Sequence, residues 1–318
     1  MPPSFSSAAV IGTGMMGPGI AVALALGGLR AAILSRTSEG AAKGIEKARE
    51  QVRVLQENAL ATADQAEHTL GLLSSSTAFD DTVAAADIVI ESGPESMEYK
   101  QEVFRRMDAI APPGTVLATN TSGLSITAIA SKCRRPERVL TAHFWNPPHL
   151  MPLVEIVKGE RTSDEAALRV RGLLASCGKI AVMVNKDRPG QLGNRLQMAL
   201  WREAVNIVQE GIASAEDVDL AAKTGFGLRL PAYGIFEHAD AVGLELVHAV
   251  MDNAAKDLYN QPQAPPLLKD LVAQGQTGVK AGRGFYDWSK KSIDDVIARR
   301  DRFLLEMLRS GVPRRARG

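Results

Sequence analysis

Cysteine is scarce in this chain: Cys133 and Cys177 are the two examples among 318 residues. They lie far apart and form no Cys-x-x-Cys pair or Cys/His cluster, which argues against a disulfide framework and a structural zinc site. Isolated thiols are typical of proteins from a reducing compartment. We therefore expect a cytoplasmic protein that holds no metal.

An excess of charge of one sign is missing as well. Lys and Arg number 37 against 36 Asp and Glu, which gives a net charge of +1. The chain thus has no overall field that would attract nucleic acid or an anionic membrane. The apolar stretch 8–34 carries one charge, Arg30, but glycines interrupt it and no basic segment precedes it, so we expect neither a membrane span nor a signal peptide. With 45% hydrophobic residues, the composition indicates a packed globular protein.

Short apolar runs alternate with helical patterns in the first half of the chain. Residues 8–11 and 31–34 flank a helical stretch at 19–27, which predicts a strand, helix, strand unit. Further strands are expected at 88–90, 116–118, 139–142, 153–157 and 180–184, with helices at 38–58 and 99–110. This alternation predicts an α/β Rossmann-type, doubly wound parallel sheet covered by helices.

Strand patterns stop after Asp187, and long helical patterns follow. They occupy residues 191–210, 215–223, 239–259, 266–274 and 293–309. We therefore expect an all-α C-terminal domain, with an NAD(P)-binding Rossmann domain at 1–187, a helical substrate and dimerisation domain at 188–290, and a C-terminal helix with a tail at 291–318. The tail is basic, and we expect it to be disordered.

A glycine-rich turn joins the first predicted strand to the first predicted helix. It reads Gly12-x-Gly14-Met15-Met16-Gly17. In dinucleotide-binding folds the first glycine permits a tight turn, the second lets the pyrophosphate approach the backbone, and the third lets helix and strand pack closely. The helix N-terminus then faces the phosphates. The turn predicts an NAD or NADP site.

The residue that follows the second strand bears on the choice of cofactor. NAD-binding folds usually place a carboxylate there to bind the adenosine ribose. Here Ser35 and Arg36 follow Leu34 instead. A serine and a cation remove repulsion from a 2′-phosphate and supply a charge-assisted hydrogen bond. This favours NADP slightly, although Arg36 can equally be a solvated loop residue beside a weak NAD site.

Polar side chains follow two central strands, at the edge where doubly wound sheets bind ligands. Asn120-Thr121-Ser122 comes after 116–118, and His143 follows the next predicted strand, 139–142. Glu155 lies inside the apolar run 153–157 and needs a partner, because an unpaired buried carboxylate is costly. His143 is the natural partner, and together they predict a general acid-base pair.

Seven segments together resemble the 3-hydroxyacyl-CoA dehydrogenase family, in that family's order and over residues 5 to about 288. They are Gly12-x-Gly14-x-x-Gly17, Asn120-Thr121-Ser122, His143-Phe144-x-Asn146-Pro147, Glu155, Pro189-Gly190-x-x-x-Asn194-Arg195, Val242-Gly243-Leu244 and Gly282-x-Gly284-Phe285-Tyr286.

The resemblance implies a role for each matching residue. His143 would take the hydroxyl proton of a 3-hydroxyacyl-CoA while hydride passes to the nicotinamide, and Glu155 would orient the imidazole. Ser122 and Asn194 would hydrogen-bond the reacting oxygen. Glu95, Lys100, Asn146 and Lys280 match positions near the cofactor. The resemblance also implies a role in fatty acid metabolism and a homodimer formed through the C-terminal domain.

Some positions depart from the family pattern. Our alignment puts Ala48 and Leu55 where the family has a serine and a lysine that contact coenzyme A. Lys47, Arg49 and Arg53 either compensate for this loss or form a solvated face. The segment 229–234 also differs from the family's usual Gly-Pro-Phe stretch. A small free 3-hydroxy acid or a hydroxylated ring compound is therefore the alternative substrate.

Two rival interpretations are weaker. The β-hydroxyacid and 6-phosphogluconate dehydrogenases place a catalytic lysine four residues before an asparagine, where this chain has Gly190 before Asn194. A non-catalytic dinucleotide-binding protein would have no reason to keep four residues together: Ser122, His143, Glu155 and Asn194.

Overall fold

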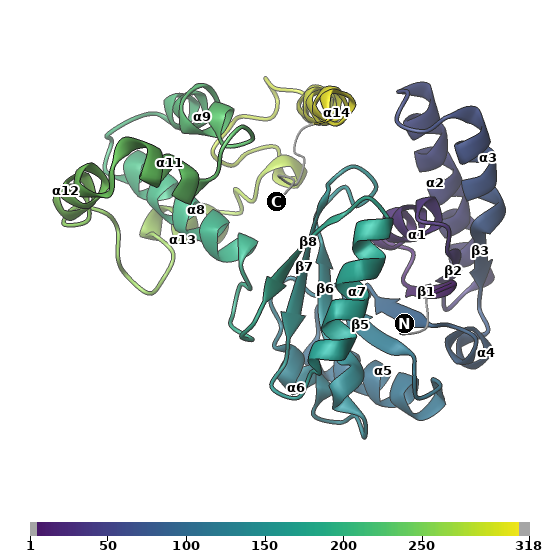
Figure 1. Ribbon diagram of the computed structural model, residues 1–318. Helices are drawn as coiled ribbons and strands as arrows, with labels where there is room; N and C mark the ends of the chain where they lie inside the picture. The colour runs from purple at the N-terminus through teal and green to yellow at the C-terminus, as the bar shows by residue number, and fades with distance from the viewer. Residues whose placement is uncertain (1–4, 312–318) are drawn as a thin grey trace. The chain divides into compact units, whose positions relative to one another are not determined.

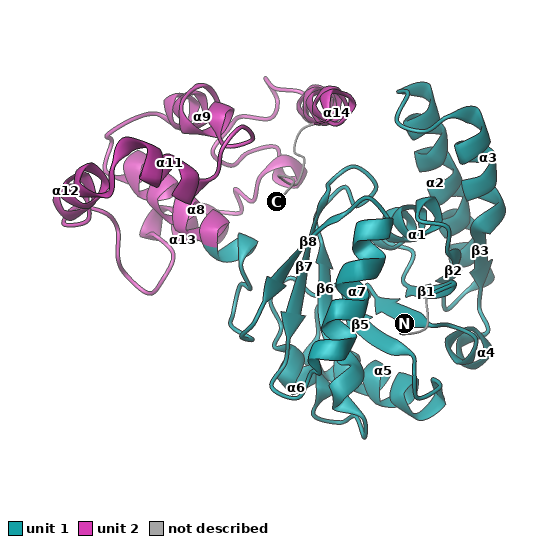
Figure 2. Cartoon of the chain, in the orientation of Figure 1, with its two compact units in different colours: residues 1–195 teal, residues 196–318 magenta. Residues whose placement is uncertain are grey.

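The computed structural model describes residues 5–311 of the chain. The chain divides into two compact units, residues 1–195 and residues 196–318 (Figure 2). The basic tail that we expected to be disordered falls at 312–318, outside the described residues. No helix in the described part of the chain is both long and apolar enough to cross a membrane.

Unit 1 is built on one eight-stranded sheet (Figure 1). Its strands are β1 (Ser7–Ile11), β2 (Arg30–Leu34), β3 (Leu73–Ser76), β4 (Ile88–Glu91), β5 (Val116–Thr119), β6 (Val139–Phe144), β7 (Leu153–Lys158) and β8 (Ile180–Val184). They lie in the order β3-β2-β1-β4-β5-β6-β7-β8. Strands on both sides of β1 wind outward from it, which confirms the predicted Rossmann-type sheet.

The helices of unit 1 connect these strands. They are α1 (Gly17–Leu26), α2 (Ser38–Glu57), α3 (Ala63–Leu72), α4 (Phe79–Ala84), α5 (Met97–Ile110), α6 (Ile126–Ala130), the short η1 (Pro136–Arg138) and α7 (Asp164–Ser176). Five of them start at a serine or threonine whose side chain accepts a hydrogen bond from the first helical turn: Thr37, Thr62, Ser96, Ser125 and Ser163. These caps satisfy backbone N–H groups that would otherwise lack partners.

The sheet buries both of its faces. Val89, Leu117 and Val139 belong to one core together with residues of α4, α5 and α6, such as Phe104. Since side chains alternate along a strand, Ile90 and its neighbours face the opposite side, where α1 packs on β1 and β2 and α7 packs on β7 and β8. Burial on both faces explains why these strands read as nearly continuous apolar runs.

One strand pair departs from the parallel arrangement that the alternation predicts. β6 and β7 are antiparallel, whereas every other neighbouring pair in the sheet is parallel. The connection from Phe144 to Leu153 is short, and a parallel pair needs a crossover of about a dozen residues. The reversal matters for the site, because antiparallel pairing sets His143 directly opposite Glu155.

Unit 2 is helical, as predicted. Its elements are α8 (Gly193–Gln209), which begins in unit 1, α9 (Ala215–Thr224), α10 (Phe226–Arg229), α11 (Ile235–Val242), α12 (Leu244–Ala254), α13 (Pro266–Ala273), η2 (Val279–Ala281) and α14 (Ile293–Ser310). The single helix expected at 239–259 is wrong. Gly243 breaks it with a φ of 92°, a left-handed conformation that helices do not contain, and α12 ends at Ala254.

Candidate active site

The glycine turn between β1 and α1 leaves no room for side chains at two of its three glycines. A Cβ at Gly17 would lie 1.9 Å from the carbonyl oxygen of Gly12, and one at Gly12 would lie 2.5 Å from the carbonyl oxygen of Ser92. Gly12 also has a φ of 117°, which favours glycine. A Cβ at Gly14 would have no protein atom within 4 Å. The turn is therefore closed toward the protein and open at Gly14.

This turn fits a dinucleotide pyrophosphate. No side chain caps α1, and Pro18 in its first turn has no N–H to satisfy, so backbone N–H groups remain for an anion. Met15 in the turn is 65% exposed, and Met16 is the N-terminal cap residue of α1. The open face at Gly14 and the helix N-terminus together supply what the phosphates require.

Ser35 and Arg36 lie at the carboxyl end of β2, beside the glycine turn. The Ser35 hydroxyl accepts a hydrogen bond from the backbone N–H of Thr37 (3.3 Å), so it shapes the turn into α2. Arg36 is exposed. Burial and the Glu91 charge raise the pKa of Tyr99, while the Arg36 charge acts in the opposite direction.

A buried ion pair supports the loop that follows β5. Lys100 is 1% exposed and its Nζ lies 2.8 and 3.0 Å from the two carboxylate oxygens of Glu91, which is fully buried. The same Nζ is 3.7 Å from Glu95. Glu95 in turn accepts hydrogen bonds from the Thr121 hydroxyl (2.5 Å) and the Ser122 backbone N–H (3.2 Å). We expected Lys100 near the cofactor, but its side chain is buried. It is linked to the segment after β5 through its contact with Glu95.

His143 and Glu155 occupy facing positions on β6 and β7. Cross-strand partners in an antiparallel pair project to the same face of the sheet. The His143 Nδ1 lies 2.8 Å from the Glu155 Oε2. This contact leaves Nε2 as the ring nitrogen directed away from the carboxylate. The pairing that we inferred from an unexplained carboxylate in an apolar run is present.

The Glu155 carboxylate accepts four hydrogen bonds. Besides His143, the Trp145 Nε1 donates to Oε2 (3.0 Å), and the backbone N–H groups of Leu192 (3.0 Å) and Gly193 (2.8 Å) donate to Oε1. Burial by itself raises the pKa of this carboxyl, but the hydrogen bonds from His143, Gly193 and Trp145 together hold it below the ordinary value. Glu155 is therefore ionised and fixed in orientation at neutral pH.

Ser122 and Asn194 come together near this pair. The Asn194 side-chain amide donates to the backbone carbonyl of Ser122 (2.9 Å), so the two residues are joined through the main chain. Ser122 is exposed at the end of the segment after β5. Gln191 donates to the neighbouring Thr121 carbonyl (2.9 Å), and the start of α8 therefore holds this segment at two points.

Two further predicted residues lie elsewhere. Asn146 is exposed at the end of β6, two residues after the strand's last position. Lys280 lies in η2 of unit 2, where it is exposed. Its contact with the cofactor stays a prediction.

Sequence reasoning missed three residues of this site. Glu91 ends an apolar strand, so the argument that singled out Glu155 also applied to it. Trp145 lies within the His-Phe-Trp-Asn-Pro segment but was given no role. Gln191 follows Pro189-Gly190 and has a φ of 52°, which the sequence does not signal for this residue type.

The coenzyme A argument based on α2 needs correction. Ala48 is fully buried and Leu55 is 3% exposed, so both face the core and neither can contact a substrate. On the exposed face, Arg53 and Arg49 both lie beside Glu46, at 3.0 and 4.0 Å. These arginines are at least partly neutralised by a solvated ion pair.

Comparison with protein families agrees with this geometry. The model of the 3-hydroxyacyl-CoA dehydrogenase NAD-binding domain matches residues 7–188, and that of the C-terminal domain matches residues 190–288. A probable 3-hydroxybutyryl-CoA dehydrogenase of Bacillus subtilis is 38% identical over 284 residues, or 89% of this chain and 97% of that protein.

A second relative has a different substrate in its name. The 5-formyl-3-hydroxy-2-methylpyridine 4-carboxylate 5-dehydrogenase of Mesorhizobium japonicum is 33% identical over 303 residues, covering 95% of this chain and 96% of that protein. The crystal structure of an enzyme with this activity, described as an NAD+-dependent dismutase, has a TM-score of 0.88 at 31% identity, with 95% of this chain and 97% of that chain covered. The chain therefore belongs to the 3-hydroxyacyl-CoA dehydrogenase family, and it is an oxidoreductase with an NAD-binding first domain.

Proposed function

We propose that this chain oxidises the secondary hydroxyl of a 3-hydroxyacyl-CoA, with His143 as the base. His143 Nε2 accepts the hydroxyl proton, and ionised Glu155 stabilises the imidazolium that forms. A nicotinamide held beside the glycine turn would supply the acceptor for the hydride that leaves the same carbon. Ser122 and Asn194 orient the reacting oxygen from the segment after β5 and from α8. The observation that carries this proposal is the 2.8 Å contact between His143 and a carboxylate that is itself held by two backbone N–H groups.

Other residues bind the cofactor or hold the residues of the site in place. Gly12, Gly14 and Gly17, with Met15 and Met16, bind the pyrophosphate, and Asn146 and Lys280 bind elsewhere on the cofactor. Lys100 acts through Glu95, because its ammonium group is enclosed by two carboxylates. Residues 1–187 hold the cofactor, and residues 188–290 form the substrate domain. The substrate domain contributes Leu192, Gly193 and Asn194 to the site.

A second candidate substrate is a hydroxylated or formylated ring compound without coenzyme A. The family models that match this chain end at residue 288. The alignment with the Mesorhizobium enzyme spans 303 residues and therefore continues into the segment that contains α14. Arg49 and Arg53 share Glu46, which offsets part of the positive charge that α2 offers to a coenzyme A phosphate.

A matrix of substrates and cofactors decides between these candidates. NAD and NADP are each assayed with 3-hydroxybutyryl-CoA, free 3-hydroxybutyrate and a pyridine aldehyde carboxylate. The main proposal expects the highest kcat/KM with the acyl-CoA. If the ring compound or the free acid turns over and the acyl-CoA gives no rate, the second candidate replaces the first.

We infer that NADP is accepted alongside NAD, through Arg36. The Arg36→Ala variant is expected to raise the dissociation constant for NADP by about tenfold, because a charge-assisted hydrogen bond contributes about 1.5–3 kcal/mol. Binding of NAD should not change. Fluorescence titration of the reduced cofactors measures both constants, and Lys43→Ala is the matched control, since Lys43 is an exposed cation on α2 paired with Glu39. Equal weakening of NAD and NADP would refute this role.

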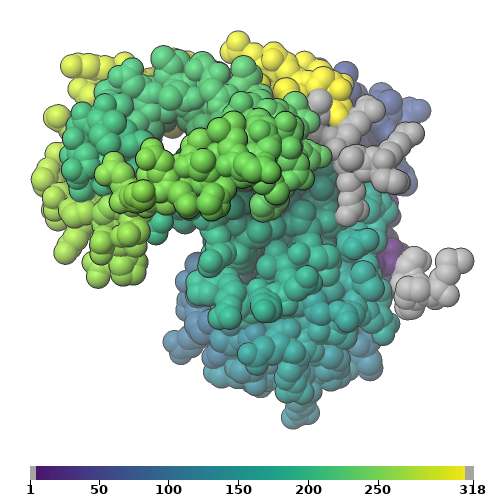
Figure 3. Space-filling model, turned by 60° about the vertical axis from the view of Figure 1, so that its left-hand side comes forward, coloured from purple at the N-terminus to yellow at the C-terminus, as the bar shows by residue number. Residues whose placement is uncertain are grey.

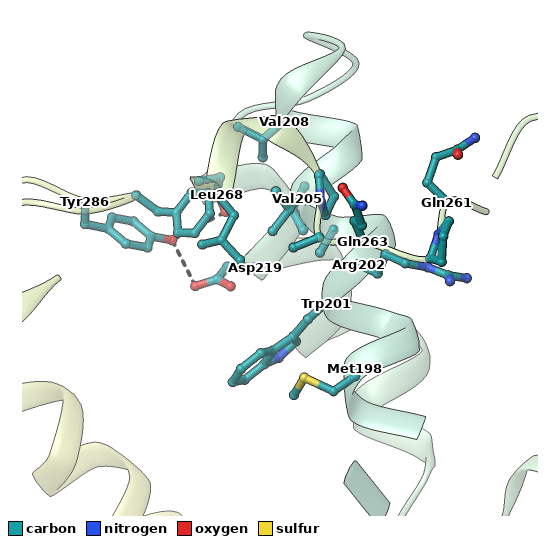
Figure 4. A pocket seen from close by; sticks show the side chains of 17 residues that line it. Met198, Trp201, Arg202, Val205, Val208, Asp219, Gln261, Gln263, Leu268 and Tyr286 are labelled. Carbon is teal, nitrogen blue, oxygen red and sulfur yellow. Dashed lines mark hydrogen bonds between the residues drawn. The ribbon is translucent and has the colours of Figure 1, made fainter. Parts of the chain in front are cut away.

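We also propose that unit 2 forms a homodimer. Helices α9 to α14 contain no buried residue within the described range, and large apolar side chains such as Phe236 (83%) and Leu246 (57%) are exposed. A pocket of about 640 Å³ lies between α8, α13 and the segment around Tyr286, lined by Trp201, Val205 and Leu268 among others (Figure 4). The surface of unit 2 is visibly hollowed (Figure 3). A second copy would cover this apolar surface.

The proposed homodimer can be tested with two matched leucine variants. Leu246→Asp on α12 should raise the dimer dissociation constant by at least about tenfold, since an apolar anchor at an interface contributes more than about 1 kcal/mol. Leu168→Asp changes a leucine of similar exposure (55%) on α7 of unit 1 and should leave the dimer intact. Sedimentation velocity measures both. A wild-type monomer at micromolar concentration would end the proposal.

Neither cysteine has a place in the proposed chemistry. Burial raises the pKa of the Cys133 thiol to about 12 and that of Cys177 to about 11, so both remain protonated at neutral pH. Unreactive, unpaired thiols suit the cytoplasm, where we propose that the protein works.

A further inference from the structure

Trp145 contacts the same carboxylate oxygen as the catalytic imidazole. It follows β6 directly, and its Nε1 donates a hydrogen bond to the Glu155 Oε2 (3.0 Å), which also lies 2.8 Å from the His143 Nδ1. The two rings are 5.7 Å apart between centroids and tilted by 54°. His143 and Trp145 therefore share one acceptor atom.

The indole is held in this position from the other side as well. A Cβ at Gly193 would lie 2.5 Å from the ring carbon Cζ2 of Trp145, so the indole rests on the backbone of the first residue of α8. The N–H group of that same Gly193 donates to the second oxygen of Glu155. The absence of a side chain at residue 193 lets the indole and the amide reach one carboxylate together.

We propose that Trp145 is a positioning residue that withdraws charge from Glu155 and so limits how strongly this carboxylate holds the imidazolium that forms on His143. This rests on the proposed role of His143. A hydrogen bond to a carboxylate oxygen stabilises its negative charge. The same oxygen then stabilises a second, positively charged donor less strongly. Without the indole N–H, the imidazolium would be held more strongly and would give up its proton at higher pH.

The charged surroundings of His143 are simple in unit 1. Glu155 on β7 is the ionised side chain that contacts the imidazole within the described residues. Ser122, after β5, and Asn194, on α8, are uncharged. Glu95 accepts hydrogen bonds from Thr121 and Ser122, and Lys100 of α5 opposes its charge at 3.7 Å. Trp145→Phe keeps an aromatic ring beside the imidazole, so the change that it makes at His143 is the loss of the indole hydrogen bond to Glu155.

The experiment compares pH profiles of kcat/KM for alcohol oxidation in the wild type and in Trp145→Phe. Phenylalanine keeps an aromatic ring but has no N–H donor. We expect the acid limb of the profile to move upward by about one pH unit, a tenfold change in a proton dissociation constant. A role in packing alone would lower the rate at every pH and leave the limb in place.

Two further variants keep the result decisive. Trp288→Phe removes an indole that packs on Tyr286 within unit 2, and its profile should match the wild type. If Trp145→Phe does not fold, site-specific incorporation of benzothienylalanine at residue 145 preserves the ring shape without the N–H. An unmoved or lowered acid limb in the folded variant overturns the proposal. Full activity of His143→Ala would instead overturn the proposed function itself.

Discussion

Replacing His143 with alanine is expected to lower kcat for alcohol oxidation by about 10²–10⁴, the usual contribution of a positioned general base. The physical reason is the pairing with Glu155, which orients the ring through Nδ1 and stabilises the proton that Nε2 takes up. Cofactor binding should not change, because the glycine turn lies between β1 and α1 and does not include the imidazole. Steady-state kinetics and cofactor titration measure the two effects separately.

The control for this prediction is His68→Ala, which removes an exposed histidine from α3 of the same unit. It should keep the wild-type rate. Glu155 would lose the hydrogen bond from the His143 Nδ1 in His143→Ala, so thermal unfolding should be measured alongside activity to exclude loss of the fold. A folded His143→Ala variant with wild-type kcat would show that another group takes the proton.

The sequence predicted the parts of this site that follow from local rules. The glycine turn could be placed because three glycines separated a buried strand from a helix, and the structure leaves no space for a Cβ at Gly12 or Gly17. The His143 and Glu155 pair could be anticipated because a carboxylate inside an apolar run requires a partner. Both inferences use constraints that neighbouring residues impose.

Other features depend on contacts between distant segments, and local patterns did not reveal them. β7 has the same apolar pattern whether it runs parallel or antiparallel to β6, and only the short connection hints at its direction. Lys100 looks like a surface residue in a polar helix, yet Glu91, on the neighbouring strand, encloses it. The inward orientation of Ala48 and Leu55 on α2 likewise depended on how that helix packs.

The antiparallel turn also explains how so small a segment assembles the acid-base pair. His143 lies on β6 and Trp145 directly after it, and Glu155 lies on β7. Leu192, before α8, and Gly193, its first residue, donate two backbone N–H groups to the carboxylate. Three chain segments thus converge on one buried charge, and each donor restricts its rotation. Such fixed orientation is what a general base needs from its partner.

The glycine turn offers the second large effect, through two substitutions that separate packing from binding. Gly17→Ala would place a Cβ 1.9 Å from the Gly12 carbonyl oxygen, so the backbone must shift. Overpacking of this kind costs about 1–3 kcal/mol, and we expect a lower melting temperature together with loss of measurable cofactor binding. Differential scanning fluorimetry and cofactor titration report the two changes.

Gly14→Ala is the matched partner, because its Cβ would meet no protein atom within 4 Å and its backbone needs no positive φ. Its melting temperature without cofactor should equal that of the wild type. A methyl group on the open face of the turn would nevertheless hold the pyrophosphate away from the backbone, so the dissociation constant for NAD should rise by at least about tenfold, or about 1.4 kcal/mol. If Gly14→Ala binds NAD as the wild type does, the phosphates do not approach this turn, and the cofactor must lie elsewhere on unit 1.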